Sequence, residues 1–227
     1  MAPQSNTAGL IRLGILGLPL AGVFTLIGSL IGLSIPDPGA DPTGAAQATT
    51  TTGYFLTQLV TLIGIILAIF GVFALFAYLL NTRGGRLATL AMVMSILGIG
   101  LILSFLGVIT YAIPALAQEY VNGQQNALEM TNALFSGRLF SILLLASLLQ
   151  LVGFVLFGTA IWRSEVLPKW SGVLLAIGGL LSSLPGNVPV ASFLGSLLIA
   201  VAGGWIALSV MRRPSAPIGA EPQPRVR

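Results

Sequence analysis

The sequence predicts an all-α protein, a polytopic transmembrane bundle of six helices with both termini in the cytoplasm. Hydrophobic residues make up 56% of the 227-residue chain and charged residues only 7%, whereas soluble domains carry roughly 25% charged residues. Six apolar segments approach or exceed the roughly 20 residues that cross a ~30 Å hydrocarbon core. Apart from Arg138, the basic residues all fall on one side of the six-span topology. Most of the chain is therefore expected to lie in lipid.

Several kinds of chemistry are excluded by residue types that are missing. The chain contains no Cys and no His, so it lacks disulfides, thiolate metal sites and the usual proton shuttle at neutral pH. No charged residue lies near the middle of a predicted span, which argues against a proton pump, a voltage sensor or a carboxylate-based hydrolase. We expect no enzymatic activity, no cofactor and no metal. Because the basic residues flank apolar runs, we also expect no nucleic-acid partner.

The first span is predicted over residues 11–35. Its apolar run is longer than the core of a signal peptide, so we expect it to be retained in the protein. Gly28 and Gly32 form a GxxxG pair, which favours a close helix contact within the chain or, as the alternative, self-association. The segment 36–53 that follows is rich in Pro, Gly and Thr. It is expected to be an irregular aqueous loop without a helix.

The second and third spans are predicted over residues 54–80 and 87–113, and a short basic turn joins them. The polar interval 114–137 follows the third span. Within it, several side chains that share one helical face predict a short amphipathic helix lying at the membrane interface. These side chains are Leu128, Thr131, Leu134 and Phe135.

The fourth span is predicted over residues 138–161, the fifth over 168–184 and the sixth over 189–211. All six spans form one transmembrane domain, residues 1–211, and residues 212–227 are expected to form a disordered basic cytoplasmic tail.

The fifth span is short, because about 17 residues is the lower limit for crossing a bilayer. Pro185 and Pro189 follow it directly. A re-entrant half-helix that lines a solute path is one interpretation. We favour a complete tilted hairpin, because only a full crossing returns the tail to the side of the other basic residues.

The orientation follows from the preference of Lys and Arg for the cytoplasmic side of short loops. With both ends inside, Arg138 is the only basic residue left outside. The cytoplasmic set comprises Arg12, Arg83, Arg86, Arg163, Lys169, Arg212, Arg213, Arg225 and Arg227.

Polar residues within the spans are the candidates for a site in the bundle interior. Such side chains usually hydrogen-bond a neighbouring helix, at roughly 0.6–2 kcal/mol each, and the alternative is a path for a neutral solute. The candidate bundle-interior residues are Gln150, Gln58, Ser147 and Ser95.

The stretch from Trp162 to Gly172 is the densest polar feature between two apolar runs, and it reads W-R-S-x-x-L-P-x-W-x-G. Trp162 and Trp170 suit the membrane interface, and Arg163 and Lys169 suit anionic lipid. We expect these four residues to be interface anchors. With its flanking helices, the stretch resembles the fourth-to-fifth helix hairpin of a broad group of bacterial six-helix integral membrane proteins of unknown function. The resemblance implies a multi-pass protein of the bacterial cytoplasmic (inner) membrane, and it carries no catalytic residues.

Two classes of function remain open at this point. The first is a non-catalytic accessory or assembly component, whose partners are membrane lipids and a second copy or another membrane protein. The second is a carrier or channel for a neutral or lipid-like small solute through a Gln/Ser/Thr-lined interior. A polar cavity that reaches Gln150 would favour transport, and a solid glycine-packed bundle would favour the accessory role.

Overall fold

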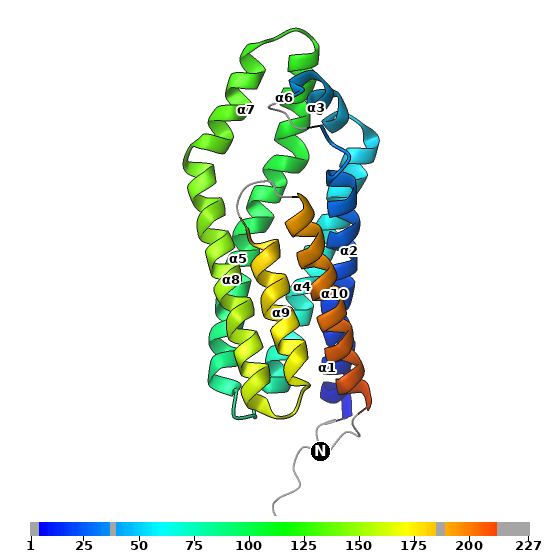
Figure 1. Cartoon of the computed structure of the whole chain (residues 1–227), viewed down its shortest axis with the longest axis vertical. Helices are drawn as coiled ribbons and strands as arrows, with labels where there is room; N and C mark the ends of the chain where they lie inside the picture. The colour runs from blue at the N-terminus through cyan, green and yellow to red at the C-terminus, as the bar shows by residue number, and fades with distance from the viewer. Residues whose placement is uncertain (1–4, 37–39, 185–188, 213–227) are drawn as a thin grey trace, which may run out of the picture.

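The computed structural model describes residues 5–36, 40–184 and 189–212, and every regular element in these ranges is a helix (Figure 1). Five helical segments are long and apolar enough to cross a membrane, namely Gly9–Gly32, Thr52–Leu79, Gly85–Val121, Leu139–Ser164 and Val190–Arg212. A further apolar helix, Lys169–Ser182, is shorter. The predicted all-helical fold is confirmed, and these five segments fit a multi-pass membrane protein. Of the predicted tail, residues 212–227, Arg212 ends the last helix and residues 213–227 lie outside the described residues.

The first predicted span is broken into two helices, α1 (Ser5–Ile15) and α2 (Gly17–Gly32). Pro19 explains the break, because it has no N–H to donate to the Ile15 carbonyl and its ring crowds that carbonyl. At the junction the Leu16 N–H bonds the Leu13 carbonyl at 3.2 Å, in the tighter 3₁₀ pattern. A Cβ on Gly28 would contact the Thr61 hydroxyl within the chain, whereas one on Gly32 would meet no atom within 4 Å.

The expectation that residues 36–53 hold no helix is wrong for their second half, which forms α3 (Pro42–Thr49). Pro42 occupies the first turn, where its missing N–H is not needed. The Asp41 carboxylate caps the helix by accepting from the Gly44 N–H at 2.8 Å. Ala45 is buried where α3 meets α6. Residues 37–39 lie outside the described part of the chain.

Helix α4 (Thr52–Leu79) matches the second predicted span, and α5 (Gly85–Gly107) begins the third. The third span continues further than predicted, through a π-helical turn (Val108–Ala112) into α6 (Ile113–Val121). In the π-helical turn the Ile113 N–H bonds the Val108 carbonyl, five residues back. Such a turn lets the helix pass Pro114 instead of ending there.

Helix α7 (Asn126–Ser136) packs beside α6 as the second arm of a hairpin that extends beyond the rest of the bundle (Figure 1). Residues 114–121, which were assigned to the polar interval after the third span, instead continue that span. Residues 126–136 are helical as predicted, although they run back toward α8 instead of lying across the end of the bundle.

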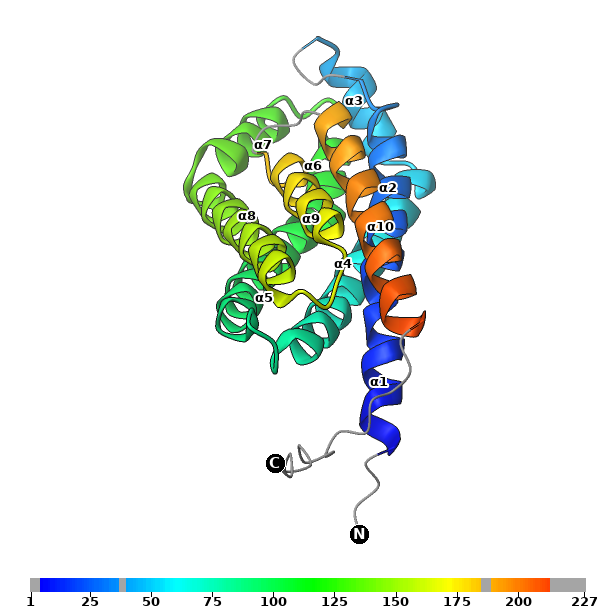
Figure 2. The ribbon, with the colours of Figure 1, turned by 60° about the horizontal axis from the view of Figure 1, so that its bottom comes forward.

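The last three helices are α8 (Arg138–Ser164), α9 (Lys169–Ser182) and α10 (Pro189–Arg212). Helix α9 packs between α8 and α10, and α10 packs against α2, so the six-membered ring α2, α4, α5, α8, α9, α10 closes on itself (Figure 2). The beginning of α1 and the end of α10 lie at the same end of the bundle. Residues 185–188, on which the re-entrant interpretation depends, lie outside the described residues.

Apolar side chains fill the half of the ring toward the α4–α5 turn and the α8–α9 loop. Leu75 from α4, Phe157 from α8 and Ile206 from α10 are each at most 1% exposed and belong to one continuous core. In this half the helices enclose a packed core.

Small residues hold the α5–α8 pair close together. On α5 and the turn before it they recur with spacings of four and three, at Gly84, Ala88, Ala91, Ser95 and Gly98. A Cβ on Gly98 would lie only 2.8 Å from the Gln150 backbone nitrogen, and one on Gly153 only 2.8 Å from that of Ser95. This is the close backbone approach that small residues allow between membrane helices.

Candidate functional site

One end of the bundle is basic. The α4–α5 turn, the α8–α9 loop, α1 and the end of α10 all meet there (Figure 1). The opposite end carries α3, α6 and α7, and Arg138 begins α8 there. The basic side chains described at the first end, here called the basic end, are Arg12, Arg83, Arg86, Arg163, Lys169 and Arg212, whereas Asp41, Glu119 and Glu129 lie on elements of the other end.

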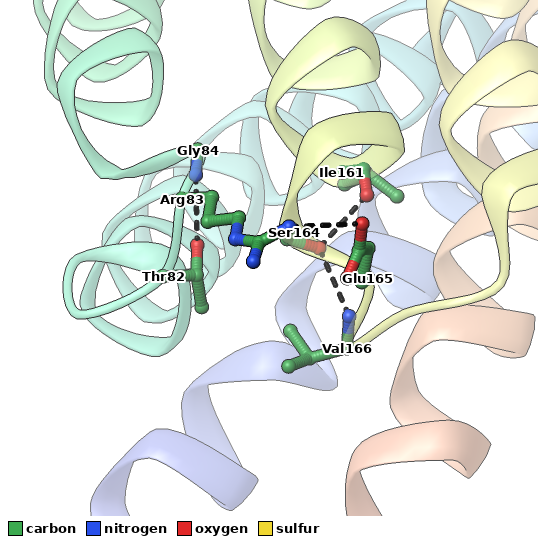
Figure 3. A network of polar contacts seen from close by, with 7 residues as sticks. All are labelled: Thr82, Arg83, Gly84, Ile161, Ser164, Glu165 and Val166. Atoms are coloured by element: carbon green, nitrogen blue, oxygen red, sulfur yellow. Dashed lines mark hydrogen bonds and ion pairs between the residues drawn. The ribbon is translucent and has the colours of Figure 1, made fainter.

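The α8–α9 loop has a defined geometry. Helix α8 ends at Glu165, whose φ of 56° puts it in the left-handed conformation that often terminates helices. The Ser164 hydroxyl donates to the Ile161 carbonyl at 2.8 Å and accepts from the Val166 N–H at 3.4 Å (Figure 3). Leu167 is buried and fixes the loop to the core.

An ion pair joins this loop to the α4–α5 turn. The Arg83 Nη1 lies 3.3 Å from the Glu165 Oε1, and the two side chains are 80% and 65% exposed (Figure 3). The turn itself is held by Thr82, whose hydroxyl donates to the Leu79 carbonyl and accepts from the Gly84 N–H. An ion pair this exposed contributes little stability, but it engages Glu165, the acidic residue of the loop.

The four predicted anchors lie together at the basic end. Trp162 and Trp170 are 47% and 66% exposed, and the Lys169 Nζ lies 5.5 Å from the centroid of the Trp162 ring. This is a cation–π distance. Arg163 is exposed beside them. Among the described residues no ion pair involves Arg163 or Lys169, so both cations are available to an anion.

Of the four polar residues singled out for the bundle interior, Ser95, Ser147 and Gln150 lie on the closely packed helices α5 and α8, and Gln58 lies on α4. Ser95 is fully buried against Gly153, and its hydroxyl has no hydrogen-bond partner. Gln150 is partly buried on α8, and Gln58 hydrogen-bonds Tyr54 on its own helix. Since α4 and α8 scarcely touch, Gln58 is separated from Ser147 and Gln150 on α8.

Two shallow apolar grooves follow α8 and α9 on the outer surface of the described bundle. The first, here the Ser147 groove, has a volume of about 310 Å³ and contains the buried, unpartnered hydroxyl of Ser183. Its lining residues are Leu144, Ser147, Leu148, Leu151, Leu180, Ser183 and Leu184.

The second groove, here the Trp162 groove, has a volume of about 220 Å³ and opens beside the predicted anchors. Gly158 and Gly172 form its floor, because a Cβ on either would lie 2.7 Å from the other's carbonyl oxygen. Its remaining lining residues are Val155, Thr159, Trp162, Val173, Ala176 and Ile177.

Sequence reasoning missed both grooves. Gly172 belongs to the W-R-S motif, but its partner Gly158 lies on the preceding helix, and only the fold brings the two together. No family model, no curated protein and no solved structure matches the chain. The resemblance of the motif stays a prediction.

Proposed function

We propose that this chain is a six-span protein of the bacterial inner membrane, with both ends cytoplasmic, and that it is a non-catalytic accessory or assembly component. The observation that carries the proposal is the packed interior of the half toward the basic end. Apolar side chains occupy the centre of the ring there, and small-residue contacts close its helix pairs. The candidate polar residues then serve as parts of helix contacts and not as the lining of a path.

The sixth crossing is α9. At 1.5 Å per residue its 14 residues extend about 21 Å. It packs along α8 on one side and α10 on the other, and α10 returns to the basic end. Basic residues gathered at one end favour its placement in the cytoplasm.

The outward face of α5 supports the assembly role. Gly100, Ser104 and Gly107 are exposed and share one face of the helix at spacings of four and three. A Cβ on Gly100 or on Gly107 would meet no atom within 4 Å. Small residues that pack on nothing within the chain leave room for a helix of another copy or of another membrane protein.

A photo-crosslinking experiment in native membranes tests this role. A photoreactive residue at Ser104 should give a discrete protein adduct, whereas one at Val152, exposed on α8, should give lipid adducts only. Gly100→Leu should abolish the protein adduct and Gly204→Leu should not, although both sites have open space for the new side chain. Lipid adducts alone from Ser104 would refute the assembly role.

A second experiment tests the orientation, and the absence of Cys from the chain makes it direct. A membrane-impermeant maleimide applied to intact cells should label Gln124→Cys in the α6–α7 turn and should spare Asn81→Cys in the α4–α5 turn. Labelling of Asn81→Cys from outside would reverse the proposed topology.

The alternative function, a carrier for a lipid-like solute, has one observation in its favour. The lining of the Ser147 groove combines apolar residues with two serines, Ser147 and Ser183, and the Ser183 hydroxyl is buried and unpartnered. Transfer of a fluorescent lipid between the leaflets of proteoliposomes, lost in a Ser147→Ala/Ser183→Ala variant, would favour this alternative over the accessory role.

A further inference from the structure

The Trp162 groove lies at the cytoplasmic end of a lipid-facing surface in the orientation proposed above. Val155, Trp162 and Ile177 are 43%, 47% and 43% exposed, so the groove opens outward. Its one hydroxyl, that of Thr159, already donates to the Leu156 carbonyl at 2.8 Å. The groove therefore offers an occupant an apolar surface.

The shape and lining of the groove suit a chain-like occupant. Its volume is about 220 Å³, and apart from Thr159 its side chains are apolar. It therefore accommodates a hydrocarbon chain.

The basic side chains at the end of the groove favour an occupant whose polar end is negatively charged. The Lys169 ammonium lies over the Trp162 ring, which itself lines the groove. Arg163 follows Trp162 directly, and Glu165, the acid of this loop, is paired with Arg83 at 3.3 Å. Lys169 therefore stands at one end of an apolar groove, Arg163 is exposed on the residue next to Trp162, and neither cation has an acidic partner among the described residues.

We propose that the Trp162 groove binds one anionic phospholipid of the cytoplasmic leaflet. An acyl chain lies over Gly158 and Gly172, and Lys169 and Arg163 hold the headgroup phosphate. Trp162 contributes to binding both the acyl chain and the headgroup, because its ring lines the groove and orients the Lys169 ammonium. This inference rests on the membrane placement of the proposed function and not on the assembly role.

Fluorescence quenching by brominated lipid tests the proposal, because the chain has only three Trp residues. The groove reporter keeps Trp162 and carries Trp170→Phe and Trp205→Phe. The reference reporter keeps Trp205, which is 42% exposed on α10, and carries Trp162→Phe and Trp170→Phe. Each is reconstituted in brominated phosphatidylcholine, and unbrominated phosphatidylglycerol is then titrated in.

The groove reporter should favour phosphatidylglycerol about five-fold, the factor that corresponds to the ~1 kcal/mol of one surface cation. The reference reporter should show no preference. Arg163→Gln/Lys169→Gln in the groove reporter should abolish the preference for phosphatidylglycerol. Val173→Phe, which fills the groove and leaves both cations in place, should also remove it, whereas Val201→Phe on the exposed face of α10 should not.

Three outcomes overturn the proposal, and they are distinguishable. Equal quenching of both reporters without lipid preference would show ordinary boundary lipid in the groove. Quenching of Trp205 alone would show that a protein segment covers the groove. Quenching of neither reporter would contradict the membrane placement itself. Should a substituted variant fail to fold, the comparison of the two reporters still decides.

Discussion

Gly98→Ala should destabilise the bundle, whereas Gly100→Ala on the same helix should not. A Cβ at Gly98 would lie 2.8 Å from the Gln150 backbone nitrogen and 3.0 Å from the Ala146 carbonyl oxygen, whereas ordinary contact starts at 3.4 Å. Since both neighbours are backbone atoms, α5 and α8 must move apart by about 0.6 Å. A gap of 0.5–1 Å forfeits roughly a quarter to a half of each van der Waals contact.

The magnitude follows from two opposing contributions. Overpacking of this kind costs roughly 1–3 kcal/mol, and replacing a helical Gly by Ala returns about 0.8–1 kcal/mol. Gly98→Ala should therefore lose about 1 kcal/mol of unfolding free energy. Gly100→Ala meets nothing within 4 Å and should gain up to about 1 kcal/mol.

The assay is reversible unfolding in mixed micelles, with helix content followed as the denaturing detergent is increased. The two variants should differ by about 2 kcal/mol, with Gly98→Ala the weaker. Equal stability of the two, or a more stable Gly98→Ala, would refute the close α5–α8 packing described above.

Three further variants test separate contacts. Ser95→Ala should keep or raise the unfolding free energy by up to about 1 kcal/mol in the same assay, because the buried Ser95 hydroxyl has no partner; a clear loss would mean that it is bonded. A double-mutant cycle of Arg83→Ala and Glu165→Ala should give a coupling of about 0–1 kcal/mol, because both side chains are largely exposed; coupling well above that range would show a desolvated pair. Asp41→Ala should lose a helix cap of about 0.5–2 kcal/mol and speed amide exchange in α3, and Asp41→Asn should largely retain the cap; unchanged exchange would contradict it.

The spans were predictable because their signal is local. Helix α4 was expected over residues 54–80 and is observed over Thr52–Leu79, since a charge-free apolar run lies between a Thr cap and a polar turn. The first span was less predictable. Pro19 interrupts this span at Leu16, because it cannot donate a hydrogen bond to the Ile15 carbonyl, and a hydropathy profile does not reveal that loss.

Helices α3 and α6 were missed because a single proline in each has two structural meanings. Pro42 suggests a loop, but it starts α3 once Asp41 caps the first turn. Pro114 suggests the end of a helix, but a π-helical turn lets α6 continue α5. The first outcome depends on the hydrogen bond from the Gly44 N–H to the Asp41 carboxylate, and the second on the backbone bond from the Ile113 N–H to the Val108 carbonyl.

In the candidate sites, contacts between residues close in sequence were predictable, and contacts between distant helices were not. Trp162 and Lys169 are close in sequence on either side of one loop, so their proximity was predictable. Gln58 and Gln150 are on helices that hardly touch, and nothing in the sequence reveals which helices are neighbours. For the same reason the pairing of Gly158 with Gly172 emerged only from the fold.

The length of α9 has a mechanical consequence for the bilayer around the protein. Its 14 residues extend about 21 Å, roughly 9 Å less than an average hydrocarbon core of ~30 Å. Each ångström of hydrophobic mismatch costs a fraction of a kcal/mol, and lipid adapts by thinning. For a bundle seated in a membrane with its basic end anchored, the thinning falls on the opposite leaflet beside Ser183. The leaflet is then locally thinned around the protein, and the free energy of deforming the bilayer is lower in a thinner membrane.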